Sequence, residues 1–284
     1  MSQCAVRLVA TDLDGTFLGP DGRVSPRAAA AVRLARSRGI EVIPVTARAP
    51  WATLAIAAEA GMGPVAVCAN GAVTYDLVAG EVIEHTPLTV EVALRVVASV
   101  REALPGVLFA SENVESMVAE RGLLDASEAR VWGLDVCQLA PDVEAHLSRG
   151  ASVTKLLCHH PDRPVESGES GESGESGEVA LKLVVEACGA LAEVTSAGAG
   201  WITIGTPGVT KAVGLAKVCG QLGLDGAQVV GVGDALNDVP MLSWVGQPLA
   251  VANACPEVLA LAQRVLPSNA EDGVAELLES LAQP

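Results

Sequence analysis

The segment that decides the fold is Val6–Thr16, which reads Val-Arg-Leu-Val-Ala-Thr-Asp-Leu-Asp-Gly-Thr. Its first part, Val6–Ala10, is a short and mainly apolar run of the kind that forms a buried strand. Asp12 and Asp14 follow that run directly. The segment therefore predicts a buried strand that continues into a loop carrying two carboxylates.

Strands and helices alternate in the chain that follows. Ser25-Pro26 is a helix start signal, with serine at the N-cap and proline at the first helical position, and Gly39 ends that helix. The next expected elements are a strand over Ile40–Val45, a helix over Pro50–Ala60 and a strand over Val65–Ala69. This alternation with short connections predicts an α/β fold, a Rossmann-like doubly wound parallel sheet covered by helices on both faces.

The alternation is then interrupted. Ala72–Ile83 has the pattern of a hairpin, and the chain beyond it mixes short strands and helices. The alternation returns with a strand over Ala227–Val232. We therefore expect a core formed by residues 1–84 and 204–284, with an inserted α/β domain over 85–203. Further helices are expected over Glu91–Leu104, Thr210–Leu222 and Glu271–Ala282.

A repeated Glu-Ser-Gly tract lies at residues 166–178 within the expected insertion. It contains no apolar side chain that could be buried in return for the entropy lost on ordering. We expect it to be a flexible, solvated loop.

Composition limits the class of partner. The chain has 284 residues, and its 18 basic and 34 acidic side chains give a formal net charge of −16. Such a surface repels nucleic-acid phosphates and anionic lipids, and the aromatic content of 2% offers few bases a stacking partner. The partner expected is a small molecule, with no nucleic acid and no membrane.

Cysteine usage bears on the compartment. The seven cysteines are an odd number, and no Cys-x-x-Cys occurs among them. No secretory signal is visible at the N-terminus, and no apolar run approaches the ~18 residues of a membrane-spanning helix. We expect buried, reduced thiols and a cytoplasmic protein.

Two pairs of acids follow two predicted strands. Asp12 and Asp14 follow the first strand, and Asp234 and Asp238 follow the strand over Ala227–Val232. In an open parallel sheet, ligands bind beyond the carboxyl ends of the strands. If the two strands are neighbours, the four carboxylates converge there, and a site with only oxygen ligands favours Mg²⁺ with substrate phosphate completing its shell.

Other strand ends carry groups that suit a phosphoryl group. Thr46 offers a hydroxyl, Arg48 lies just beyond it, Asn70 ends the third strand, and Lys211 begins a later helix. A phosphoryl group needs hydroxyl, amide and lysine donors together with a metal. An aspartate can attack phosphorus, and a second acid can protonate the leaving oxygen and then deprotonate water.

These segments together resemble the four motifs of the haloacid dehalogenase superfamily, in the same order. The motifs are Asp12-Leu13-Asp14-Gly15-Thr16, Thr46, Lys211 and Gly233-Asp234-Ala235-Leu236-Asn237-Asp238. The Asn70-Gly71 pair and the large insertion resemble its Cof-like branch, whose α/β cap is called class IIB. The resemblance covers the whole chain, although within the insertion it is one of size and position only.

The resemblance implies roles for these residues. Asp12 is the expected nucleophile and a metal ligand, and Asp14 the expected general acid and base, with its backbone carbonyl on Mg²⁺. Thr46 is expected to bind the phosphoryl group. Lys211 is expected to neutralise that group and to orient Asp12.

The last motif supplies the remaining roles. Asp234 is expected to hold Mg²⁺, Asp238 to support the metal shell, and Asn237 to contact phosphate. The family usually has glycine after Thr46, where this chain has Ala47. The Ala47 amide can still donate to phosphate, but a left-handed backbone there would be strained.

Other interpretations of the same residues compete with these. A calcium loop at Asp12 would have Phe17 where glycine is required, and a dinucleotide fingerprint at Gly231 would have Leu236 in place of its third glycine. Thr210 stands where a P-loop needs glycine. Arg48 is either a surface ion-pair partner or a substrate contact, and Asn70 either a substrate contact or part of a turn. His159 and His160 are expected on the surface, and Trp201 in packing.

The sequence thus predicts a phosphoric monoester hydrolase that acts on a small phosphorylated metabolite, with sugar phosphates favoured by the resemblance. The hydrolysis would proceed through an aspartyl phosphate on Asp12. A phosphomutase and a non-catalytic metabolite-binding protein on the same fold are the alternatives, and the chain is expected to be a monomer or homodimer.

Overall fold

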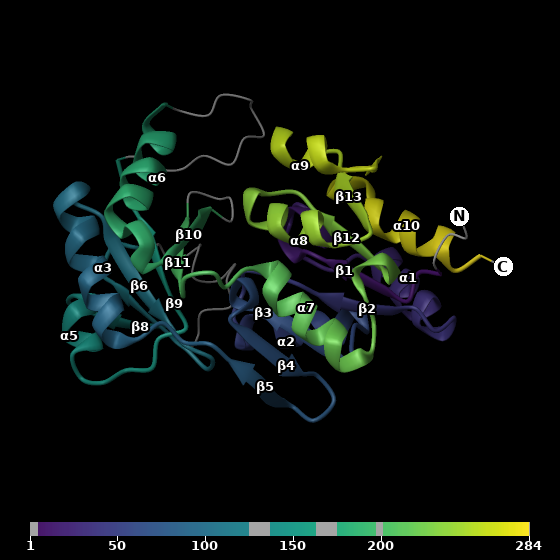
Figure 1. Ribbon diagram of the computed structural model, residues 1–284, viewed down its shortest axis with the longest axis horizontal. Helices are drawn as coiled ribbons and strands as arrows, with labels where there is room; N and C mark the ends of the chain where they lie inside the picture. The colour runs from purple at the N-terminus through teal and green to yellow at the C-terminus, as the bar shows by residue number, and fades with distance from the viewer. Residues whose placement is uncertain (1–4, 125–136, 163–174, 197–200, 284) are drawn as a thin grey trace. The chain divides into compact units, whose positions relative to one another are not determined.

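The computed structural model describes residues 5–124, 137–162, 175–196 and 201–283. Contacts divide the chain into two compact units (Figure 1). Unit 1 consists of Met1–Glu84 and Thr210–Pro284, and unit 2 of His85–Val209. The expected insertion ended at residue 203, whereas the contacts place the following segment in unit 2, where the Thr206 hydroxyl donates to the Thr86 carbonyl.

A five-stranded parallel sheet is the centre of unit 1, with strand order β14-β13-β12-β1-β2. Its strands are β1 (Leu8–Thr11), β2 (Glu41–Pro44), β12 (Val229–Gly233), β13 (Gln247–Val251) and β14 (Arg264–Leu266). Every residue of β1 and β12 is buried, as expected of near-continuous apolar strands covered on both faces. This confirms the doubly wound α/β fold.

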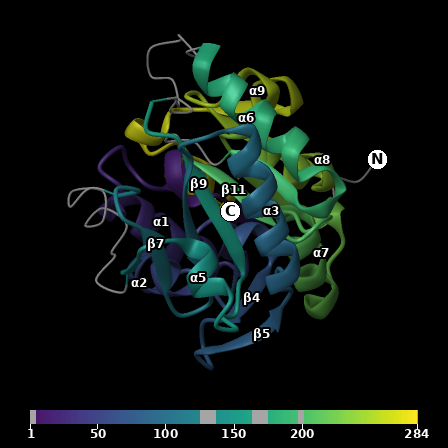
Figure 2. The ribbon, with the colours of Figure 1, turned by 90° about the vertical axis from the view of Figure 1, so that its left-hand side faces the viewer.

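Helices lie on opposite sides of unit 1. In Figure 2, α1 and α2 lie on one side and α7 and α8 on the other. The helices are α1 (Pro26–Ser37), α2 (Pro50–Ala60), α7 (Lys211–Leu222), α8 (Val239–Trp244), α9 (Pro256–Leu261) and α10 (Gly273–Leu281). The start signal before α1 acts as predicted, since the Ser25 hydroxyl accepts a hydrogen bond from the Ala28 amide.

The third expected strand departs from the prediction. β3 (Val65–Cys68) pairs antiparallel with β4 (Val73–Asp76), and β5 (Glu81–His85) completes a separate three-stranded sheet. β3 meets the parallel sheet through one parallel bridge, between Val45 and Val67. β3 is therefore paired along its length with β4 and joins the parallel sheet at this bridge alone among the described residues.

Unit 2 is built on a six-stranded sheet with strand order β10-β11-β9-β6-β7-β8. It is mainly antiparallel, with one parallel pair, β7 with β8. The strands are β6 (Leu108–Glu112), β7 (Met117–Glu120), β8 (Cys137–Ala140), β9 (Lys155–His159), β10 (Glu193–Ser196) and β11 (Ile202–Gly205). The helices are α3 (Val90–Ala103), α5 (Val143–Leu147) and α6 (Glu175–Cys188). This unit has a buried apolar cluster of its own, which includes Phe109 and Leu156.

The Glu-Ser-Gly tract lies largely outside the described residues. The flexible loop predicted for residues 166–178 is wrong for residues 175–178, because helix α6 begins at Glu175. The expectation of buried thiols holds for Cys68, Cys158, Cys188 and Cys219, whereas Cys255 is only partly buried. Among the described helices, none combines the length and apolar character that crossing a membrane requires.

Candidate active site

The site is formed where strands of unit 1 end. β1 and β12 are hydrogen-bonded neighbours, and the Asp12 amide donates to the Val232 carbonyl at 3.0 Å. Asp12 and Asp14 follow β1, and Asp234 and Asp238 follow β12, so the two acidic segments emerge side by side. The two strands are therefore neighbours, which is the condition that the predicted convergence of the acids required.

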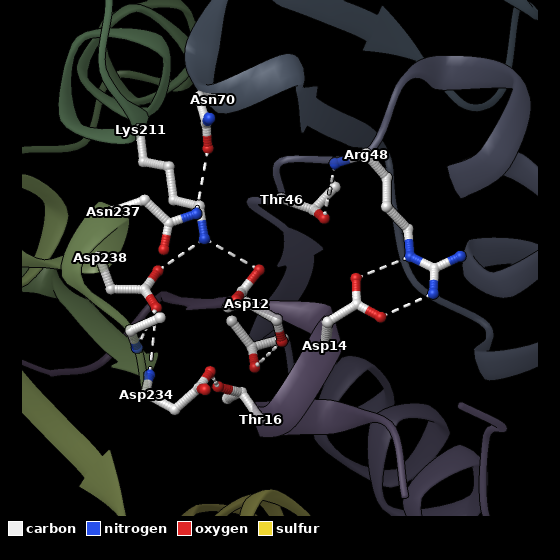
Figure 3. A network of polar contacts seen from close by, with 12 residues as sticks. Asp12, Asp14, Thr16, Thr46, Arg48, Asn70, Lys211, Asp234, Asn237 and Asp238 are labelled. Atoms are coloured by element: carbon white, nitrogen blue, oxygen red, sulfur yellow. Dashed lines mark hydrogen bonds and ion pairs between the residues drawn. The ribbon is translucent and has the colours of Figure 1, made fainter. Parts of the chain in front are cut away.

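Three carboxylates converge in this position. Oxygen atoms of Asp12, Asp234 and Asp238 lie within 4.8 Å of one another. Lys211 Nζ contacts Asp12 Oδ1 at 2.9 Å and Asp238 Oδ1 at 2.7 Å (Figure 3). The Lys211 side chain is fully buried, so its ammonium is committed to these two acids. The three carboxylates still carry more negative charge than one lysine neutralises.

The pKa values reflect this excess of charge. Burial, opposed by Lys211 and reinforced by the neighbouring acids, raises the pKa of Asp12 well above its ordinary value. Burial together with Asp238 raises the pKa of Asp234 to about 7. Burial alone would lower the pKa of Lys211, but Asp12 and Asp238 outweigh it and raise that pKa. Because hard oxygen donors with excess negative charge suit a divalent cation, the residues present fit such an ion.

Asp238 differs from the other two acids in its hydrogen bonds. Its Oδ1 contacts Lys211, and its Oδ2 accepts from the backbone amides of Asp234 at 3.0 Å and Ala235 at 3.2 Å. A side chain at Gly233 would collide with it, since a Cβ there would lie 2.5 Å from the Asp238 carboxyl carbon. Asp238 thus fixes the lysine and the loop that carries Asp234.

The loop after β1 holds Asp234 from the other side. The Thr16 hydroxyl donates to Asp234 Oδ1 at 2.5 Å. Gly15 has a φ of +73°, and a Cβ at this position would lie 2.4 Å from Asp234 Oδ2. Glycine is required here both for its backbone conformation and for the space it leaves.

Lys211 is positioned by close backbone packing. Thr210 caps α7, its hydroxyl accepting from the Val213 amide. A Cβ on Gly71 would lie 2.1 Å from the Thr210 carbonyl oxygen, and one on Gly214 would lie 2.8 Å from the Gly71 Cα. Two facing glycines therefore let the first turn of α7 approach the loop after β3.

Backbone hydrogen bonds join the loops after β2 and β3. The Asn70 amide donates to the Thr46 carbonyl at 3.0 Å, and the Ala69 amide to the Arg48 carbonyl at 2.8 Å. Ala69 and Asn70 have left-handed φ values of +50° and +55°. Ala47 is not among the described non-glycine residues with positive φ, so the strain expected there does not arise.

Asn70 and Asn237 form a buried amide pair. Asn237 Nδ2 donates to Asn70 Oδ1 at 3.2 Å (Figure 3). Asn70 Nδ2 and Asn237 Oδ1 are buried without a hydrogen-bond partner. Exchanging the oxygen and nitrogen of both amides would again leave one donor and one acceptor unused. The pair therefore retains hydrogen-bonding capacity for a ligand.

The sequence predicts that four carboxylates converge, but the group contains three, and Asp14 stands apart from them. Its Oδ2 accepts from Arg48 Nε at 2.7 Å and its Oδ1 from Arg48 Nη2 at 2.6 Å. Arg48 thus forms an ion pair, but it is buried, whereas the interpretation as an ion-pair partner placed it on the surface. Its contact with substrate stays a prediction. The metal contact that the family resemblance implies for Asp14 uses its backbone carbonyl, which this ion pair leaves unaffected.

Several residues in this region had no predicted role. Thr16 and Gly15 lie within a recognised motif, but their contacts to Asp234 depend on the neighbouring strand. Asn253 follows β13, and its side-chain Nδ2 donates to the Gly15 carbonyl at 2.7 Å. A polar residue just beyond a parallel strand is the signal that would have identified it.

The two neighbouring histidines of unit 2, His159 and His160, differ in burial. His160 was expected on the surface, but it is buried, with its ring Nε2 3.0 Å from the Pro105 carbonyl oxygen. His159 is only partly buried, and its ring centroid lies 5.5 Å from that of Trp201. Trp201 is itself buried, in agreement with a packing role.

Known proteins resemble the chain over nearly its full length. A profile of haloacid dehalogenase-like hydrolases matches residues 9–278. Pyridoxal phosphate phosphatase YbhA of Escherichia coli K12 is 27% identical, with 96% of this chain and 98% of the relative covered. Phosphatase YwpJ of Bacillus subtilis is 28% identical, with 97% and 100% covered.

Solved structures share the fold. SMU.1108c from Streptococcus mutans UA159 superposes with a TM-score of 0.81 at 20% identity, covering 97% of this chain and 98% of that one. The subclass IIB sugar phosphatase BT4131 gives a TM-score of 0.78 at 18% identity, with 97% and 98% covered. The family and the Cof-like branch inferred from the motifs are thereby confirmed. The chain belongs to the haloacid dehalogenase-like hydrolase family and is an enzyme of its phosphatase type.

Proposed function

We propose that the chain is a Mg²⁺-dependent phosphatase that hydrolyses a small phosphorylated metabolite through a phosphoryl group carried transiently on Asp12. The observation that carries the proposal is the convergence of Asp12, Asp234 and Asp238, of which only Asp12 and Asp238 contact Lys211. A buried group with this excess of negative charge is better suited to binding a cation and a phosphate than to stabilising the fold. The phosphatases among the relatives support the same activity.

Asp12, Asp234 and the backbone carbonyl of Asp14 are the groups we assign to the Mg²⁺ ion, with Asp238 supporting them. Oxygen donors of this kind match the preference of Mg²⁺. When bound, the ion supplies positive charge next to the transferring phosphoryl group. Lys211 contributes a second positive charge and orients the Asp12 carboxylate through Oδ1.

The chemistry assigned to Asp12 and Asp14 has two steps. An Asp12 carboxylate oxygen forms a bond to phosphorus while the ester P–O bond breaks, and the leaving oxygen takes a proton from the Asp14 carboxyl group. A water oxygen then attacks phosphorus and gives a proton to Asp14, and the bond from phosphorus to Asp12 breaks. Inorganic phosphate is released and both carboxyl groups return to their starting states.

The phosphoryl oxygens need donors other than Lys211. We assign the Thr46 hydroxyl, the Ala47 amide and the amide pair of Asn70 and Asn237 to this role. The support for the amide pair is its unused, buried hydrogen-bonding capacity. A phosphoryl oxygen or a hydroxyl of the substrate would satisfy it.

We assign unit 2 to the role of a cap that selects the substrate. The named activities of relatives, on pyridoxal phosphate and on sugar phosphates, define the first compounds to test. A cytoplasmic location is part of this proposal, and the buried thiols of Cys158 and Cys219 are compatible with a reducing compartment.

The test is a phosphate-release assay on a panel of phosphorylated metabolites, with Mg²⁺ and after chelation. Asp12→Asn removes the nucleophile and is expected to lower turnover by about 10⁴-fold or more. Asp21→Asn, at an exposed turn, is the matched control and should leave turnover unchanged. Near-normal turnover by Asp12→Asn would overturn the nucleophile assignment. Isomerised substrate without free phosphate would identify a phosphomutase. The absence of turnover on every ester would identify a binding protein.

A further inference from the structure

The loop after β13, residues 252–255, contacts both of the loops that carry the acids of the site. Asn253 Nδ2 donates to the Gly15 carbonyl at 2.7 Å, in the loop after β1. The Cys255 amide donates to the Asp234 carbonyl at 2.8 Å, in the loop after β12. Since β13, β12 and β1 are adjacent in the parallel sheet, this third loop joins the two acidic loops where the strands end.

Asn253 is exposed, yet both polar atoms of its side chain have partners in the protein. Besides the bond that Nδ2 donates, Oδ1 accepts from the Asn269 amide at 3.0 Å. Asn269 Nδ2 in turn donates to the Leu18 carbonyl at 2.9 Å, at the far end of the loop after β1. An exposed amide can bond to water, so the fold alone does not require these contacts. Together they fix the Asn253 side chain with its donor directed at Gly15.

The Gly15 carbonyl belongs to the peptide group that joins the two residues in contact with the Asp234 carboxylate. The Thr16 hydroxyl donates to Asp234 Oδ1 at 2.5 Å (Figure 3), and a Cβ at Gly15 would lie 2.4 Å from Asp234 Oδ2. The peptide group before Gly15 carries the Asp14 carbonyl, which is also assigned to the ion. Because glycine restricts its own backbone least of all residues, the hydrogen bond from Asn253 limits how these peptide groups can rotate.

We propose that Asn253 is a positioning residue that fixes the Gly15 carbonyl and so holds two of the assigned metal ligands in place. These ligands are the Asp14 carbonyl and the Asp234 carboxylate, and the inference rests on the proposed function, in which both bind Mg²⁺. Mg²⁺ requires a near-ideal octahedral arrangement of its oxygen ligands, so a small displacement of two of them weakens binding. Contacts that orient metal ligands typically change metal affinity by about 10- to 100-fold.

The test measures the binding of Mg²⁺ alone to the metal-free protein, by calorimetry and by the shift in thermal unfolding as Mg²⁺ is added. Asn253→Ala removes the donor to Gly15 and is expected to weaken Mg²⁺ binding by about 10-fold or more. Asn253→Asp retains an acceptor for the Asn269 amide but has no donor for Gly15. It should also bind Mg²⁺ more weakly than the wild-type protein, although its added negative charge by itself would favour a cation.

Two controls separate positioning from the loss of any exposed hydrogen bond. Gln263 Nε2 also donates to a glycine carbonyl, that of Gly246 at 3.2 Å, but this contact lies at the other end of β13. Gln263→Ala should therefore leave Mg²⁺ binding unchanged. Asn269→Ala loses the bond to the Leu18 carbonyl but retains the backbone amide that donates to Asn253. It should weaken Mg²⁺ binding less than Asn253→Ala does.

Mg²⁺ binding as tight as that of the wild-type protein, in either Asn253 variant that folds, would overturn the inference while leaving the phosphatase function intact. An equal loss in Asn269→Ala and Asn253→Ala would do the same, because the effect would then come from fixing the loop as a whole. Thermal unfolding verifies that each variant folds, and Asn253→Asp carries the test if Asn253→Ala does not fold. A wild-type protein that binds no Mg²⁺ would refute the proposed metal dependence itself, and with it the role of Asn253.

Discussion

The two units treat buried charge in opposite ways. In unit 2, Glu120 is fully satisfied: its Oε1 accepts from Arg101 and from the Val143 amide, and its Oε2 accepts from the Phe109 amide. Glu112 faces Lys155 in a pair of one negative and one positive charge, at 3.2 Å. In unit 1, three carboxylates converge, and Lys211 contacts two of them, Asp12 and Asp238.

The difference distinguishes buried charges that organise the fold from buried charges that serve a function. A pair of opposite charges organises a fold at little net cost, whereas uncompensated carboxylates repel each other and destabilise it. Unit 1 retains this repulsion where strands β1 and β12 end. The most direct physical explanation is that a ligand supplies the missing positive charge.

The largest expected effect comes from removing each buried lysine in turn. Lys211→Met leaves Asp12 and Asp238 unpaired and should lower the free energy of unfolding by about 3–5 kcal/mol. Lys155→Met also removes a buried ammonium, but it leaves one carboxylate, Glu112, unpaired instead of two. Denaturant unfolding should therefore show the larger loss for Lys211→Met.

Added Mg²⁺ provides a second comparison of the stabilities of the two lysine variants. Added Mg²⁺ should stabilise Lys211→Met more than Lys155→Met, because only the first variant gains negative charge at the site assigned to the ion. Equal stabilisation of the two variants would mean that the excess charge of unit 1 is not directed at a cation.

The next largest expected effect is a change in the free energy of unfolding of the metal-free protein with pH. The pKa of Asp234 is raised to about 7 when folded, against about 3.9 when unfolded, so the folded state binds the proton more tightly between these values. The resulting stability is fully present below about pH 4 and is lost as the pH rises through 7. We expect a loss of roughly 2–3 kcal/mol between pH 5 and 7, since each pKa unit corresponds to about 1.4 kcal/mol.

Denaturant unfolding in a chelator at several pH values measures this loss. Asp12, whose pKa is also raised, should act in the same direction. Asp234→Asn should flatten the dependence, and Mg²⁺ should do so by holding the carboxylates ionised. A stability that increases from pH 5 to 7 in the wild-type protein would contradict the charge excess assigned to unit 1.

The smallest expected effect isolates a single contact. Gly15 and Gly22 have nearly the same φ, +73° and +72°, but a Cβ at Gly22 meets no atom within 4 Å, whereas one at Gly15 meets Asp234. Both alanine variants incur backbone strain of about 1 kcal/mol. Only Gly15→Ala should also weaken Mg²⁺ binding, measured by calorimetry. Equal affinities in the two variants would show that the position of Asp234 is not critical.

Much of unit 1 could be predicted from local signals. The helix start at Ser25-Pro26 and the apolar runs of β1 and β12 depend on nearby residues, and the structure forms them as expected. Acids just beyond two parallel strands were predicted to converge because such strands end at the same edge of a sheet. The roles of these residues stay predictions, which the variants above test.

The sequence by itself determined the α/β class, the order of the motifs and the set of acids and the lysine, because chain-local periodicity and residue chemistry carry that information. Only the tertiary structure decided that β3 joins the hairpin, that Arg48 pairs with Asp14 and that Asn70 faces Asn237. Those outcomes depend on which distant backbones approach one another, and on glycines such as Gly71 and Gly214 that permit the approach. Long-range packing of this kind has no local sequence signal.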